Sequence, residues 1–111
     1  MKSYEVYKYR RAALDWTTRI LAEKSQIKVE DIEKFENGFG VNRTIEDKIK
    51  DSINAGFKEL DAVDHYKCRI LELGYEIKYE TDKTQLLYRI SHMMIELGKL
   101  ERETLDTLSM N

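Results

Sequence analysis

The sequence contains no proline, one cysteine and one tryptophan among its 111 residues. The absence of proline removes the strongest helix breaker, and the many leucine, isoleucine, lysine and glutamate residues favour a mainly helical protein. A single cysteine excludes an internal disulfide, and Cys68 with His65 supplies at most two of the four ligands of a structural zinc. We therefore predict an all-α protein with no metal site and no cofactor.

Long apolar runs and catalytic motifs are also missing. No secretory h-region and no stretch of about 20 apolar residues occurs, so we expect a cytoplasmic protein without a membrane partner. There is no Ser-His-Asp set, no Gly-rich phosphate loop and no metal cluster. His65 and His92 stand in helical, apolar surroundings, where a structural histidine is commoner than a catalytic one. We expect no catalytic residues and no enzyme.

An excess of basic charge is missing as well. The net charge is −2 and the sequence pI is 5.7, which argues mildly against nucleic-acid binding. The charge is uneven, because residues 1–57 carry 11 basic and 10 acidic side chains, a net +1, whereas residues 58–111 carry 8 and 11, a net −3. The amino-terminal half is therefore the better candidate for contact with phosphates.

Capping residues and apolar spacing predict two short helices at the amino terminus. Ser3 can cap a helix that ends near Asp15. Thr17 can cap a second one, whose apolar stripe breaks at residues 25–26.

Two further helices complete this half of the chain. One resumes at Val29 and stops at residues 37–38, where Asn-Gly is typical of a left-handed helix end. Two helices of about eight residues joined by three or four have the spacing of a helix-turn-helix. Thr44 can cap another helix, whose isoleucines recur every four residues until Gly56.

The carboxy-terminal half begins with a helical apolar pattern from Phe57 to Leu73, which Gly74 is expected to end. In residues 75–80 apolar and charged side chains then alternate with the period of a strand. A lone strand is not stable without a partner. We expect either a short strand or an extended linker here.

A last helix is predicted from about Lys83 to Leu108. It carries a heptad-like seam, for which the candidate dimerisation residues are Leu86, Ile90, Met93, Leu97 and Leu100. Such a seam needs a partner surface. It can pack back on the preceding helix as a hairpin, it can form a homodimer, and the two arrangements are compatible.

The run from Leu14 to Gly38 contains Trp16, Leu21-Ala22, Ile27, Ile32, Phe35 and Glu36-Asn37-Gly38 in one register without a gap. This run resembles the second helix, turn and third helix of the Cro and phage-repressor (XRE) family of bacterial DNA-binding regulators. The resemblance covers residues 4–56 and implies a five-helix helix-turn-helix domain over residues 1–56, followed by a helical extension over residues 57–111. It also implies an ion pair between Arg11 and Glu36.

The resemblance implies DNA-facing positions, each of which has a physical role. Thr17 and Thr18, at the start of the second helix, would hold a phosphate. Asn37 and Arg43 would contact the DNA backbone. Base edges in the major groove would be contacted by Lys28, Val29, Glu30, Glu33 and Lys34.

Three of the residues in this third helix are acidic where the family usually has neutral polar or basic ones. One carboxylate can accept from the cytosine amino group, but Glu30, Asp31 and Glu33 together repel phosphates. Asp31 can instead stabilise the helix, because a carboxylate in the first turn interacts favourably with the helix dipole.

We expect a sequence-specific transcriptional regulator of bacterial or phage type, bound to double-stranded operator DNA as a homodimer. The alternative is a repressor-like fold used to bind another regulatory protein through the acidic helix, as an antirepressor, adaptor or DNA mimic.

Overall fold

The computed structural model describes residues 2–109, which form six helices and no strand. The helices are α1 (Ser3–Ala13), α2 (Thr18–Ser25), α3 (Val29–Glu36), α4 (Arg43–Lys58), α5 (Ala62–Tyr79) and α6 (Lys83–Ser109). The expectation of an all-α protein is confirmed. The chain divides into two compact units at the link between Glu59 and Leu60.

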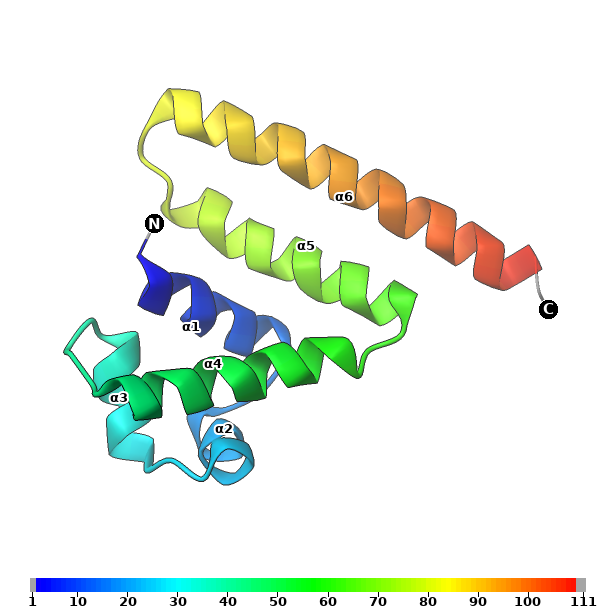
Figure 1. The fold of residues 1–111 in the computed structure, drawn as a ribbon. Helices are drawn as coiled ribbons and strands as arrows, with labels where there is room; N and C mark the ends of the chain where they lie inside the picture. The colour runs from blue at the N-terminus through cyan, green and yellow to red at the C-terminus, as the bar shows by residue number, and fades with distance from the viewer. Residues whose placement is uncertain (1, 110–111) are drawn as a thin grey trace. The chain divides into compact units, whose positions relative to one another are not determined.

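The amino-terminal unit is built around α4, which contacts α1, α2 and α3 (Figure 1). Ile49, Ile53 and Phe57 recur every four residues on one side of α4 and are buried. Leu21 from α2 and Ile32 from α3 are fully buried. Burial of these side chains is the main stabilising contribution in so small a core.

Helix boundaries in this unit differ from the predicted ones at three places. Lys2, rather than Ser3, is the N-cap of α1, and its side chain makes no cap hydrogen bond. Asn42, rather than Thr44, caps α4, because its Oδ1 accepts from the Ile45 backbone N–H at 2.9 Å. Gly56 does not end α4, since the four-residue apolar spacing carries on to Phe57.

The residues predicted to hold five helices therefore hold four within the described part of the chain, because α4 is one continuous helix. Gly56 has another role there. A Cβ at this position would lie 2.5 Å from Cη2 of Trp16 and 3.1 Å from Cδ1 of Leu14. The glycine thus allows the Trp16 indole to lie directly against the α4 backbone.

The carboxy-terminal unit is a hairpin of two helices, α5 and α6, joined by a short turn (Figure 1). The prediction of a strand or linker at residues 75–80 is wrong, because α5 continues through Gly74 to Tyr79. A helical series with spacings of four, three and four, Tyr66, Ile70, Leu73 and Ile77, runs through the same segment. This series outweighs both the period-two pattern and the modest helix penalty of one glycine.

Two carboxylates hold the hairpin closed at its turn. Arg89 of α6 donates from Nε to Oε1 of Glu80 at 2.7 Å and from Nη1 to Oε2 of Glu76 at 3.1 Å. All three side chains are largely buried. This contact fixes which side of α6 faces α5.

Candidate functional site

The segment predicted to be a helix-turn-helix comprises α2, three linking residues and α3. Gln26 takes a left-handed conformation, with φ 57° and ψ 39°, and its N–H bonds back to the Ala22 carbonyl. This conformation ends α2 abruptly and lets the chain re-enter a helix at Val29. Ser25 is buried and donates from Oγ to the Leu21 carbonyl at 2.6 Å, which satisfies its hydroxyl inside the core.

The start of α2 agrees with the predicted cap. Oγ1 of Thr17 accepts from the Ile20 backbone N–H at 3.1 Å. The Thr17 side chain is exposed and that of Thr18 is half-buried. Arg19, in the same turn, is exposed and forms no ion pair among residues 2–109. Arg19, an exposed cation beside a helix amino terminus, was not among the site residues predicted from the sequence.

The outer side of α3 brings together more of the predicted site residues than any other helix side that the structure describes. Glu30, Glu33, Lys34 and Asn37 follow the spacing three, one and three, which puts them on one side of a helix, and all four are exposed. The opposite side buries Ile32, Phe35 and Glu36.

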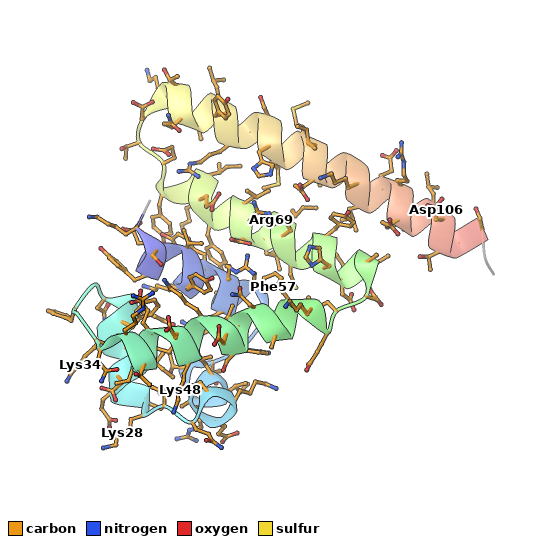
Figure 2. All side chains as sticks on the ribbon, viewed as in Figure 1. Lys28, Lys34, Lys48, Phe57, Arg69 and Asp106 are labelled. Carbon is orange, nitrogen blue, oxygen red and sulfur yellow. The ribbon has the colours of Figure 1, made fainter. Side chains whose placement is uncertain are left out.

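Lys28 and Lys34 lie near the two ends of this outer side. Lys28 is the exposed N-cap of α3, and Lys34 lies in its last turn. Figure 2 shows both side chains projecting away from the amino-terminal unit. Val29 and Asp31 are half-buried, so they contribute less to this surface. Asp31 stands in the first turn of α3, where a carboxylate is favourable for the helix dipole.

Asn37 and Arg43 flank the same side of the unit. The Asn37 amide donates to the Glu33 carbonyl at 2.8 Å, so this side chain serves first to close the end of α3. Gly38 follows with φ +81° and completes the left-handed stop predicted for residues 37–38. Arg43 is almost fully exposed and lies only loosely beside Asp47, at 3.9 Å. Its guanidinium is available for a phosphate.

The expected ion pair beneath α3 is present. Arg11 donates from Nε and Nη2 to the two oxygens of Glu36, at 2.5 and 2.8 Å, and from Nη1 to the Trp16 carbonyl at 2.7 Å. Both side chains are largely buried. A two-bond pair of this kind fixes orientation as well as distance. It anchors the end of α3 to α1 and to the start of the α1–α2 link, and thereby sets the angle at which α3 is presented.

Of the candidate dimerisation residues, Leu86, Met93 and Leu100 lie three residues before and four and eleven after Arg89. They therefore share its helix side, which faces α5, and all three are half-buried. Ile90 and Leu97 stay exposed. The hairpin thus occupies part of the predicted seam.

The single cysteine and the two histidines lie on α5 and α6. Burial raises the pKa of the Cys68 thiol, and the Asp64 carboxylate adds to the rise. His65 and His92 lie on helices but are exposed, which differs from the apolar surroundings expected of them. Within residues 2–109 no three His, Cys, Asp or Glu side chains are placed to share a metal ion. None of the helices described has the length and apolar character needed to cross a membrane.

Comparison with protein-family models, with curated proteins and with solved structures finds no match for this chain.

Proposed function

We propose that this chain is a sequence-specific DNA-binding transcriptional regulator of bacterial or phage type, which binds an operator as a homodimer through a repressor-like helix-turn-helix. The observation that carries this proposal is the α2–turn–α3 arrangement. Two eight-residue helices meet at a left-handed turn, and the second presents an exposed polar side while its other side is buried. An exposed helix of this kind can enter the major groove.

The exposed groups allow a division of roles. Lys28, Glu30, Glu33 and Lys34 face base edges, with Val29 at their margin. Lysine donates to guanine acceptors and glutamate accepts from the cytosine amino group, so this set favours G·C pairs. Contacts to phosphates, which set the position of the protein on the duplex, come from Thr17, Thr18, Arg19, Asn37 and Arg43.

Selection from random-sequence DNA with the full-length protein tests this function. The expected result is an inverted repeat whose half-sites are centred about 10 base pairs, one helical turn, apart. Binding should weaken steeply as salt rises, since each phosphate contact releases counterions. Lys28→Glu and Arg43→Glu should each reduce the salt slope, whereas Lys58→Glu, a change of an exposed lysine at the far end of α4, should not. Absence of enrichment at low salt would contradict the proposal.

A second candidate function rests on the acidic residues of α3. Glu30 and Glu33 are exposed, and neither forms an ion pair in the part of the chain that the structure describes. Their carboxylates repel phosphates but attract a basic protein surface. Under this alternative the same fold acts as an antirepressor, adaptor or DNA mimic, and α3 binds a regulatory protein rather than an operator.

A further inference from the structure

Helix α6 has an apolar side that the hairpin does not use. We name it the outer stripe, made of Leu87, Ile90, Met94 and Leu97, whose side chains are 67%, 39%, 67% and 46% exposed. Their spacings of three, four and three put them on one side of the helix. Large apolar side chains clustered on an exposed surface mark an interaction site more often than a solvated one.

The α5–α6 contact does not cover this stripe. Arg89 faces α5 through Glu76 and Glu80, and the stripe residue Met94 lies five positions further along. Five residues turn a helix by about 500°, that is by about 140° beyond a full turn, so Met94 points well away from Arg89. The hairpin thus leaves the stripe available for a partner.

Two charged residues flank the stripe on the same side of α6, and beyond Glu101 that side carries two further exposed leucines, Leu105 and Leu108. Lys83 and Glu101 are both exposed and are 18 residues apart, which is five full turns of an α-helix, so they lie on the same side about 27 Å from each other. Neither forms an ion pair within the described residues. The stripe is therefore flanked by a positive residue before Leu87 and by a negative residue after Leu97.

This charge order makes the stripe complementary to its own reversed copy. When two α6 helices run antiparallel about a two-fold axis at the midpoint between Lys83 and Glu101, Lys83 of each copy lies opposite Glu101 of the other. The same register puts Leu87 opposite Leu97 and Ile90 opposite Met94, so every apolar stripe residue meets another. A parallel pair would instead oppose lysine to lysine and glutamate to glutamate, which is unfavourable.

Small residues border the stripe on one side. Thr84, Ser91 and Gly98 recur every seven residues, so they follow the stripe along its length. Glycine is disfavoured inside a helix, and a Cβ at Gly98 would meet nothing within 4 Å in this structure. A second helix packed against the stripe would come close to these small residues.

We propose that two copies of this chain pair antiparallel through the outer stripe of α6, with Lys83 and Glu101 forming two ion pairs across the interface. This inference rests on the homodimer part of the proposed function and gives that dimer its interface and orientation. It requires no contact with DNA. The isologous geometry is the usual one for a two-fold dimer.

Sedimentation velocity of the full-length protein at micromolar concentration tests the pairing. Wild type should sediment as twice the 13.2 kDa chain. Met94→Asp puts a carboxylate opposite Ile90 of the second copy and should give a monomer with an unchanged circular dichroism spectrum. Tyr88→Asp is the matched control, because Tyr88 is 76% exposed but lies outside the stripe, and it should leave the dimer intact.

The charge pairs test the orientation. Lys83→Glu and Glu101→Lys should each raise the dimer dissociation constant by about tenfold at low salt and by less at high salt, since two exposed pairs are reversed at once. The double variant restores both pairs only in the antiparallel register, and it should return to wild-type affinity.

A monomeric wild type would overturn the inference, as would a dimer that survives Met94→Asp or a double variant that is not restored. Fluorescence anisotropy with the selected DNA separates this result from the proposed function. DNA binding by a monomeric wild type would leave the proposed DNA binding in place and remove the pairing. A dimer without DNA binding would do the reverse.

Discussion

Gly56 lies against the indole of Trp16, and the absence of a side chain there is a packing requirement. A Cβ would lie 2.5 Å from Cη2 and 2.6 Å from Cζ2 of Trp16. Gly56→Ala should therefore destabilise the amino-terminal unit by about 1 to 3 kcal/mol, because overpacking outweighs the better helix propensity of alanine. Urea unfolding followed by tryptophan fluorescence measures this directly, since Trp16 is the single tryptophan.

Gly74 provides the matched control for that substitution. It also lies inside a helix, but a Cβ there would meet nothing within 4 Å. Gly74→Ala should stabilise α5 by about 0.5 to 1 kcal/mol, as judged by thermal unfolding in circular dichroism. If both alanines proved equally harmless, the close contact between Trp16 and α4 would be wrong.

At the residue scale, local rules and a resemblance were enough to predict some contacts, whereas contacts created by tertiary packing were missed. Thr17 is a cap because of a local rule, and the Arg11–Glu36 pair follows from the family resemblance. Gly56 has the ordinary signature of a helix end, and only its neighbour Trp16, 40 residues away in sequence, turns it into a contact residue. No local pattern carries that information.

The hairpin of α5 and α6 depends on Arg89, and this dependence should vary with pH. The hydrogen bond from Arg89 holds the pKa of the Glu80 carboxyl below its ordinary value of 4.5, and the same contact raises the pKa of Arg89, which stays charged. A carboxyl with a lowered folded-state pKa contributes stability that is complete above its unfolded pKa. That contribution is lost as the pH falls through the folded value.

Wild type should accordingly lose hairpin stability below pH 4.5 more steeply than Glu80→Gln does. Thermal unfolding between neutral pH and pH 3, followed by circular dichroism, makes the comparison. Asp106→Asn is the control, since Asp106 is an exposed carboxylate of α6 without an ion pair among residues 2–109. Parallel pH profiles for wild type and Glu80→Gln would mean that the contact between Glu80 and Arg89 does not stabilise the hairpin.

The acidic residues of α3 distinguish the two candidate functions. Replacing Glu30 and Glu33 with glutamine removes two exposed negative charges from the proposed DNA-facing side. If α3 lies against DNA, non-specific affinity at low salt should rise by about fivefold for each charge, because each repulsion amounts to about 1 kcal/mol near a surface. Fluorescence anisotropy with random duplex DNA gives this number.

Asp51→Asn is the reference for that measurement, since Asp51 is an exposed carboxylate on α4. Unchanged DNA affinity in the double glutamine variant, together with loss of a protein partner captured by wild type, would favour the alternative in which α3 binds protein.

The sequence predicted all six helices that the structure describes, but it did not predict several of the residues at which they begin or end. The starts of α2, α3 and α6 follow from caps and apolar periods in the sequence. The segment 75–80 was mispredicted because Ile77 belongs both to the period-two pattern of this segment and to the helical series that begins at Tyr66. The contact of Glu76 with Arg89 favours the helix. Tertiary contacts select the helix there.

On the scale of the whole molecule, the exposed side of α3 and the outer stripe of α6 lie in different units of one chain. If both proposals hold, the stripe joins two helix-turn-helix domains, and binding of the second half-site becomes an intramolecular event. Such linkage strengthens binding to a two-site DNA by about 100-fold or more without any new contact to the DNA.

Met94→Asp should therefore weaken binding to the selected inverted repeat by about 100-fold, while binding to DNA with a single half-site stays as in wild type. Tyr88→Asp should match wild type on both DNAs. Titrations followed by anisotropy, at protein concentrations where wild type is dimeric, separate the two effects. A Met94→Asp protein that binds the inverted repeat as tightly as wild type would show that the stripe contributes nothing to DNA binding, because a change confined to α6 leaves every α3 contact in place.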